Sequence, residues 1–383
     1  MSRAEHVTRS IVGIMALLTV ALTAGCGGGG GGDGPDQNPG IPVAKVLPTI
    51  TGTININGAT NVPINTKVGA TFSKGMDPST LTGTTLFLMQ GTTPVPGTVS
   101  YSGVSAVLAP TSNLAPATVY TVTVKGGASG VKDVAGNAMA NDYIWAWTTG
   151  GAPDTIPPTV LGTINADGAT DVAINTKLGA TFSEGMDPLT VTAGTFFLKQ
   201  GSTAVPGSVS YSGVSAVLAP AGSLSPGKIY IVTIKGGVDG VKDLAGNVMA
   251  NDYVWSWTTS VSSDTSPPVV ASTTIANGAT GIAIDAIVAA MFSEGMDPLT
   301  VTNVNCLLVE TVSGVAANAV TISYSRGRVD FILDSFGPGP PSLLHPGTSY
   351  TVTIKGGVGG VEDLAGNPMT NDYQWHFTTV ATP

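Results

Sequence analysis

The sequence has few charged residues and few histidines and cysteines. Charged residues make up 10% of its 383 positions, and the formal net charge is −9. A protein that binds nucleic acid through the phosphates needs stripes of lysine and arginine, which an acidic chain of this kind does not provide. We therefore exclude nucleic acid as a partner.

The 3 histidines and 2 cysteines also argue against catalysis. A Ser-His-Asp or Cys-His site needs a histidine in the fold, and a zinc site needs clustered cysteine or histidine. His345 and His376 both lie near the C-terminal end, and neither has another histidine or a cysteine close to it in the sequence. The chain contains three copies of a repeat, described below, and Cys306 occupies the position that Leu86 and Phe196 have in the other two copies. It is therefore predicted to be a core residue. We predict that the protein is not an enzyme.

Glycine and proline are abundant instead, with 51 and 26 residues. Together with many threonine and valine residues, they are typical of short strands separated by frequent turns. A chain of 383 residues exceeds the usual size of one hydrophobic core and favours two to four domains. The composition therefore predicts a multidomain all-β protein.

The N-terminus resembles a lipoprotein signal peptide. Arg3 and Arg9 precede an apolar run, residues 11–22, that is too short to span a bilayer comfortably. The run ends in small residues before Cys26, which resembles a lipobox, although Thr23 stands where a leucine is usual. We predict that residues 1–25 are removed and that Cys26 is lipidated. An ordinary signal peptide with an incidental cysteine is the alternative.

Residues 26–47 are predicted to be a flexible tether. Six glycines follow Cys26, and residues 27–40, rich in glycine, proline and polar residues, cannot bury apolar area. No aspartate follows Cys26 directly, and the resemblance to lipoproteins of two-membrane bacteria then favours the outer membrane. The lipid would make the membrane a partner, at the cell envelope or the cell surface.

The remainder repeats one unit three times. A Phe-Ser-x-Gly-Met-Asp-Pro segment recurs at a spacing of 110 residues, and an Asp-x-Ala-Gly-Asn segment recurs at spacings of 110 and 120. A period of this length corresponds to a whole domain. The predicted domains are module 1, residues 48–150; module 2, residues 151–260; and module 3, residues 261–383.

Within each unit, the hydrophobic pattern has a period of two. Val68, Ala70 and Phe72 alternate with small or polar residues, as in a strand with one buried face. About seven such segments occur per unit, and a tyrosine opens the sixth after a Leu-x-Pro corner, as Tyr120 does. The fold class is therefore predicted to be all-β, with three tandem immunoglobulin-like antiparallel β-sandwiches in a rod.

Each unit resembles the bacterial Ig-like domain of the S-layer SbsA type. The segments that match are Pro157–Pro158, Asn165–Thr170, Phe182–Pro188 and Val241–Asn247, and all three units have counterparts of them. The resemblance implies a spacer or adhesive unit of an exported protein. We predict a non-catalytic cell-envelope lipoprotein that acts as a structural spacer or adhesive rod. The alternative is a module that binds a surface glycan or protein, with interdomain joints stiffened by calcium.

Acidic residues are predicted to meet at each joint. The B–C and F–G loops of a sandwich lie at the pole where the chain enters, beside the preceding linker. Carboxylate oxygens from three segments suit Ca²⁺, which is the only cofactor we consider, and the alternative is that these residues only shape turns. The candidate ligands are Asp154, Glu184, Asp187 and Asp243 in module 2, and Asp264, Glu294, Asp297 and Asp363 in module 3.

Module 3 is longer than modules 1 and 2. Three extra residues fall before Tyr324 and seven between Arg326 and Pro346. The longer loop joins the fifth and sixth strands and is predicted to lie at the pole away from the linker. Arg326, Arg328 and Phe336 are therefore candidates for contact with a partner. An insertion without function is the alternative, because loops tolerate extra length cheaply.

Overall fold

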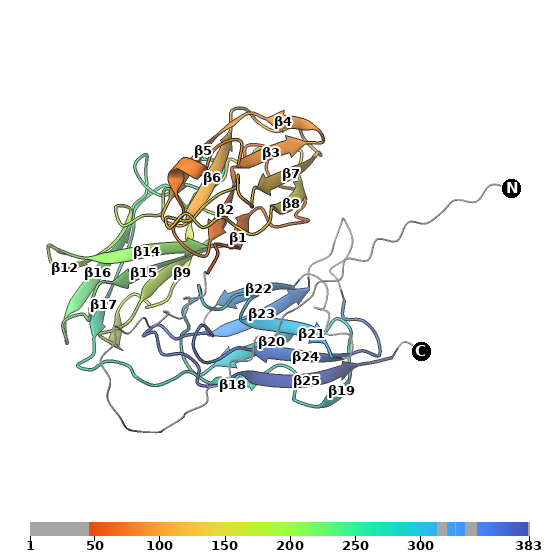
Figure 1. Cartoon of the computed structure of the whole chain (residues 1–383). Coiled ribbons are helices and arrows are strands. Elements are labelled where there is room, and N and C mark those ends of the chain that lie inside the picture. Colours follow the sequence, from red (N-terminus) through yellow and green to blue (C-terminus); the bar gives the residue numbers. More distant parts are fainter. Residues whose placement is uncertain (1–45, 312–319, 326, 334–342, 382–383) are drawn as a thin grey trace, which may run out of the picture. The chain divides into compact units, whose positions relative to one another are not determined.

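The computed structural model describes residues 46–311, 320–325, 327–333 and 343–381, shown in colour in Figure 1. The predicted signal peptide, Cys26 and most of the predicted tether lie outside these residues. The described residues form twenty-five strands and one three-residue 3₁₀ turn, Pro78–Thr80, and no α-helix. The fold class is all-β, as predicted, with three immunoglobulin-like domains in tandem. Within the described part of the chain, we find no helix with the length and hydropathy needed to cross a membrane.

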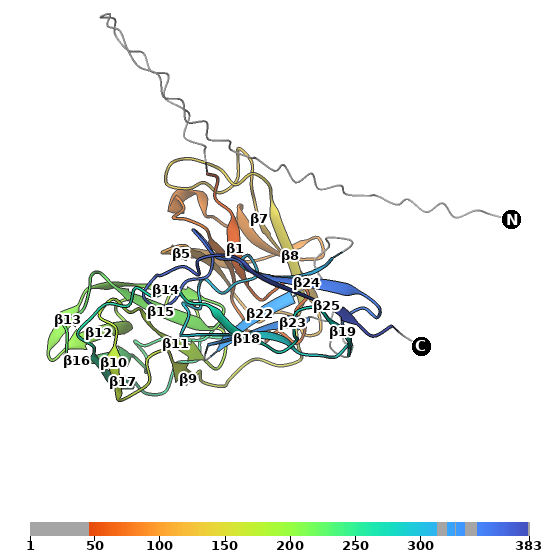
Figure 2. The same cartoon turned by 90° about the horizontal axis from the view of Figure 1, so that it is seen from below.

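Module 1 consists of two antiparallel sheets that face each other (Figures 1 and 2). One sheet has the order β1-β2-β6-β5 and the other β4-β3-β7-β8. Strands that are distant in sequence pair in each sheet, as expected for Greek-key connections. The strands are β1 (Ile50–Ile54), β2 (Val68–Phe72), β3 (Leu86–Gln90), β4 (Thr93–Val95), β5 (Gly97–Ser102), β6 (Ser105–Pro110), β7 (Val119–Val124) and β8 (Tyr143–Thr148).

Module 2 repeats this arrangement with one more strand. Its sheets have the orders β14-β15-β11-β9 and β10-β17-β16-β12-β13. The additional strand, β10, pairs parallel to β17. The strands are β9 (Val160–Thr163), β10 (Ala169–Val172), β11 (Leu178–Phe182), β12 (Phe196–Gln200), β13 (Thr203–Val205), β14 (Gly207–Ser212), β15 (Ser215–Pro220), β16 (Ile229–Ile234) and β17 (Tyr253–Thr259).

Module 3 has sheets of the orders β18-β20-β23-β22 and β19-β25-β24-β21. The strands are β18 (Val270–Thr273), β19 (Ala279–Ile282), β20 (Val288–Phe292), β21 (Cys306–Glu310), β22 (Val320–Ser325), β23 (Arg328–Leu333), β24 (Ser349–Ile354) and β25 (Tyr373–Thr379). The described strands thus number eight or nine per module, whereas the sequence predicted about seven. The difference arises from very short strands such as β4 and β10, which are too short to show a period of two.

Each module has its own hydrophobic core between its two sheets. In module 1, Val68, Ala70 and Phe72 of β2 point into the core, and each is at most 2% exposed. Equivalent clusters fill modules 2 and 3, and Cys306 is a buried member of the third. The alternation of apolar residues therefore identified the buried face of β2, because successive side chains of a strand point to opposite sides.

The predicted tyrosine corners are confirmed in all three modules. The hydroxyl of Tyr120 accepts a hydrogen bond from the backbone N–H of Ala115 at 2.8 Å, and Tyr230 and Tyr350 make the same bond to Ser225 and His345. This bond fixes the connection between the two sheets at the start of β7, β16 and β24.

Two tryptophans pack against these tyrosines, each with an unpaired indole N–H. Trp147 and Trp257 are each 1% exposed, their ring centroids lie 5.5 and 5.4 Å from those of Tyr120 and Tyr230, and neither indole nitrogen has a hydrogen-bond partner. Phe377 takes the same place in module 3, 5.5 Å from its tyrosine.

We therefore expect Trp147→Phe to change the free energy of unfolding of module 1 by less than about 1.5 kcal/mol, as measured by urea denaturation. The lost apolar area is offset because an unpaired buried donor, which costs about 1–3 kcal/mol, disappears with it. Trp147→Ala leaves a cavity and should cost about 3–5 kcal/mol. A loss above 3 kcal/mol for Trp147→Phe would show that the indole N–H has a partner after all.

Candidate cation site at the module joints

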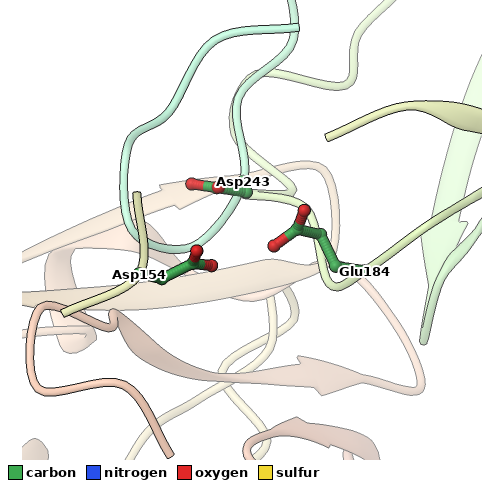
Figure 3. Close-up of side chains that lie close together, drawn as sticks. All are labelled: Asp154, Glu184 and Asp243. Atoms are coloured by element: carbon green, nitrogen blue, oxygen red, sulfur yellow. The ribbon is translucent and has the colours of Figure 1, made fainter. Parts of the chain in front are cut away.

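Three carboxylates from three segments meet at the start of module 2. Asp154 lies in the segment before β9, Glu184 in the B–C loop after β11, and Asp243 in the F–G loop between β16 and β17. One oxygen of each lies within 4.8 Å of an oxygen of the other two, and Figure 3 shows the side chains next to one another. Module 3 repeats the cluster with Asp264, Glu294 and Asp363.

Asp243 is the innermost member, with no exposed surface. Its Oδ1 accepts a hydrogen bond from the backbone N–H of Asn247, and its Oδ2 accepts one from the side-chain amide of the same residue, both at 2.8 Å. Gly246 between them has a φ of 93°, a conformation that glycine adopts readily and other residues seldom do. The carboxylate therefore closes its own loop, which is the turn-shaping role that the sequence left as an alternative.

The backbone of the linker residue Asp154 is held by module 1. The side-chain amide of Asn65 donates to the carbonyl of Asp154 and accepts from its N–H, both at 2.8 Å. Asn175 makes the same pair of bonds to Asp264, at 2.8 and 2.9 Å. A side chain of the preceding module thus positions the linker carboxylate beside the loops of the next module.

Burial and the neighbouring carboxylates raise the pKa of the central glutamate in each cluster. Burial, followed by the hydrogen bond and negative charge of Asp154 and the charge of Asp243, raises the pKa of Glu184 to about 7. Burial, with the charges of Asp264 and Asp363, likewise raises the pKa of Glu294 to about 7. A cation between the oxygens would reverse this effect, because it stabilises the ionised form.

Asp187 and Asp297 do not lie in the clusters, contrary to the grouping expected from the sequence. Oδ1 of Asp187 accepts from the N–H of Leu189 and shapes the turn after the loop, while Oδ2 lies 2.5 Å from Nζ of Lys67 in module 1. Asp297 likewise contacts Lys177, at 2.7 Å. A lysine of the preceding module therefore draws each of these carboxylates away from the other three.

Module 1 has a lysine where the other modules have the central glutamate. Nζ of Lys74 lies 3.5 Å from Oδ2 of Asp133, the counterpart of Asp243, and donates to the carbonyl of Val46 at 2.6 Å. In module 1, an ammonium group thus lies beside the loop aspartate in place of the glutamate carboxylate.

The donor set of the two clusters fits a hard divalent cation. All side-chain donors are carboxylate oxygens, and backbone carbonyls lie in the same loops, which suits Ca²⁺ with its six to eight oxygen ligands. No histidine or cysteine belongs to either cluster, as zinc would favour. Asp154, Glu184 and Asp243 would hold the ion in module 2, and their counterparts would hold it in module 3.

The other candidate residues lie apart from this site. Arg328 is described, and its guanidinium bonds to Asp330 on the same strand at 2.6 and 2.8 Å, whereas Arg326 and Phe336 lie outside the described residues. Burial raises the pKa of the Cys306 thiol to about 12, so it stays protonated and unreactive at neutral pH.

Sequence reasoning missed the residues with which each module holds the next, Asn65 and Lys67 with their counterparts Asn175 and Lys177. A signal was present, because both preceding modules read Asn-Thr-Lys at this place, while module 3 reads Asp285-Ala286-Ile287.

A model of the bacterial Ig-like domain family matches three segments of the chain, residues 44–149, 154–259 and 264–379. The search of curated proteins returned no match. The solved structures of similar fold include surface layer protein SbsC, domains 1–6, with 12% identity and a TM-score of 0.25 over 89% of this chain and 55% of that one.

The N-terminal part of the bacterial S-layer protein SbsC is also similar, with 16% identity and a TM-score of 0.22 over 58% of this chain and 44% of that one. The chain therefore spans about half the length of these S-layer structures. Immunoglobulin domains 1–4 of sidekick-1 share 9% identity, with a TM-score of 0.23, over 88% of this chain and 76% of that one. Likenesses this weak carry no functional conclusion.

Proposed function

Because the chain belongs to the bacterial Ig-like domain family over three tandem segments, we propose that it is a non-catalytic spacer or adhesive module of the cell surface. The observation that supports this most is the repeated joint. Each linker is bonded to the module before it, by Asn65 or Asn175, and lies among the loops of the module after it. A chain that only needed separate binding domains would gain nothing from such repeated contacts between them.

In this proposal, the protein is a lipoprotein that is attached to the outer membrane or cell surface through Cys26. We expect Cys26→Ser to abolish incorporation of labelled palmitate and to move the protein from the membrane fraction to the soluble fraction. Cys306→Ser is the matched control and should change neither, because Cys306 is buried in a core. If the parent protein incorporates no labelled palmitate, the ordinary signal peptide is favoured. If the modules of the parent protein resist protease added to whole cells, they lie inside the envelope.

The adhesive contact is assigned, within this proposal, to Arg326, Arg328 and Phe336, in the segment that is longer in module 3 than in modules 1 and 2. A screen against surface glycans and matrix proteins tests it, with deletion of residues 335–341 as the variant. If binding survives the deletion, this segment does not make the adhesive contact, and only the spacer role remains proposed.

We further propose that the two carboxylate clusters bind Ca²⁺ and stiffen the joints. The observation that favours this is the central glutamate of each cluster, Glu184 or Glu294, which lies close to two other carboxylates. Module 1, whose described residues include no such cluster, has Lys74 at this position. Isothermal titration calorimetry should give two sites per chain, one site in Glu184→Gln, and two in Asp239→Asn, which removes an exposed acid of the same F–G loop. Undetectable heat at millimolar calcium would refute the proposal.

A further inference from the structure

A second contact lies at each joint, on a carboxylate that the cluster does not use. The side chains of Asp187 and Asp297 are only 4% and 6% exposed, and each contacts the ammonium of a lysine in the preceding module. Asp77 has the same place in module 1 and is partly exposed. A carboxylate this deeply buried needs a partner, because the loss of its hydration is otherwise uncompensated.

The same lysines also bond through the backbone. The N–H of Lys67 donates to the carbonyl of Leu244 in the F–G loop of module 2 at 3.0 Å, and that of Lys177 donates to Leu364 in module 3 at 2.7 Å. Each lysine therefore contacts both loops of the following module, the B–C loop through its side chain and the F–G loop through its backbone; the ammonium of Lys177 also lies 3.7 Å from Glu362 in the F–G loop. The asparagine two positions earlier bonds to the linker between them.

Module 3 differs from modules 1 and 2 at these positions. Modules 1 and 2, which another module follows, have asparagine and lysine there. Module 3 has Asp285 and Ile287 instead, and Ile287 is 65% exposed. An ionised Asp285 cannot donate to a linker carbonyl, and Ile287 cannot pair with an aspartate, so this end of module 3 lacks both contacts.

We propose that Lys67 and Lys177 are specificity-determining residues that fix which module end is seated against which. The Asn-x-Lys end of one module recognises the B–C loop aspartate and the F–G loop carbonyl of the next, in one direction only. The contact does not require a cation, since the lysines and the candidate calcium sites use different carboxylates. Its partner class is the loop pole of another bacterial Ig-like module, and only modules 1 and 2 have the matching end.

The test measures the spread of distances between modules 1 and 2 in the full chain by double electron–electron resonance. Spin labels are placed at the exposed positions 119 and 229 through Val119→Cys and Ile229→Cys. Cys26→Ser leaves Cys306, which is buried, as the only native cysteine, and chelator is present throughout. We expect a narrow distribution that broadens at least twofold in Lys67→Ala and in Lys67→Asp. The exchange of both charges, Lys67→Asp with Asp187→Lys, should narrow it again.

Two variants separate this role from general damage. Lys177→Ala acts on the other joint and should leave the module 1–2 distribution unchanged. Asp77→Lys removes the hydrogen bond that Asp77 accepts from the backbone N–H of Ser79, just as Asp187→Lys removes the one from Leu189. Because Asp77 does not lie at the joint between modules 1 and 2, this variant should also leave the distribution unchanged. A Lys67→Ala distribution as narrow as the parent's, a parent distribution that is already broad, or a charge exchange without recovery would each overturn the proposal.

Discussion

Calcium should raise the melting temperature of modules 2 and 3 and leave that of module 1 unchanged. A ligand that binds only the folded state stabilises it by about 2.7 kcal/mol at a concentration a hundred times its dissociation constant. For a domain of about 100 residues, this corresponds to roughly 10–20 °C. Module 1 is an internal control, because Lys74 already lies beside Asp133 there.

The shift can be assigned to individual modules by hydrogen exchange of their peptides along a temperature series, in calcium and in chelator. Glu184→Gln should remove the shift of module 2 and leave that of module 3, whereas Asp239→Asn should remove neither. Equal shifts in all three modules would mean that calcium acts on the net negative charge of the chain and not at the clusters.

The effect of calcium should weaken as the pH falls through 7. Glu184 and Glu294 have pKa values raised to about 7 by burial and by the neighbouring carboxylates, so below this pH they retain a proton that calcium must displace. In chelator, the folded-state pKa of each lies above its ordinary value of 4.5, so its ionisation opposes folding. Without calcium, modules 2 and 3 should therefore lose stability as the pH rises from about 4.5 to about 7, which melting curves across this range would measure.

The sequence predicted the fold and much of the candidate site because both depend on local pattern. Alternation placed Phe72 inside the core, the repeat length gave three domains, and the order of strands in a sandwich brings Asp154, Glu184 and Asp243 to one pole. The same reasoning grouped Asp187 with these three, since it lies only three residues after Glu184. The backbone turns between them, and the side chain of Asp187 faces module 1 instead.

The lysines could not be found by that route, because their partners lie 120 residues away in another domain. Knowledge of the strand order does not locate the end of a long, flexible side chain. The difference between the copies contained the information. Modules 1 and 2, whose lysines contact the following module, have a lysine at this position, whereas module 3 has Ile287.

Replacing Asp243 by alanine should destabilise module 2 by about 3 kcal/mol even in chelator. The buried carboxylate accepts two hydrogen bonds from Asn247, and hydrogen bonds to a charged group contribute about 1.5–3 kcal/mol each. Two opposing contributions have to be compared, because the substitution also removes the repulsion between Asp243 and Glu184. We expect the hydrogen bonds to dominate, since Glu184 relieves the repulsion by taking up a proton near neutral pH.

Urea denaturation of Asp243→Ala, Asp243→Asn and Asp133→Ala measures these contributions separately. Asp243→Asn retains an acceptor for the N–H of Asn247 and removes the negative charge, so its loss should be well below that of Asp243→Ala. Asp133 makes the same two bonds in module 1, accepts a third from the backbone N–H of Ala135 at 3.0 Å, and has a lysine as its neighbour instead of a glutamate, so Asp133→Ala should cost more than Asp243→Ala. An Asp243→Ala protein that is more stable than the parent in chelator would reverse the order of the two contributions: the loop would then be strained by its three carboxylates, and a cation would be needed to keep it closed.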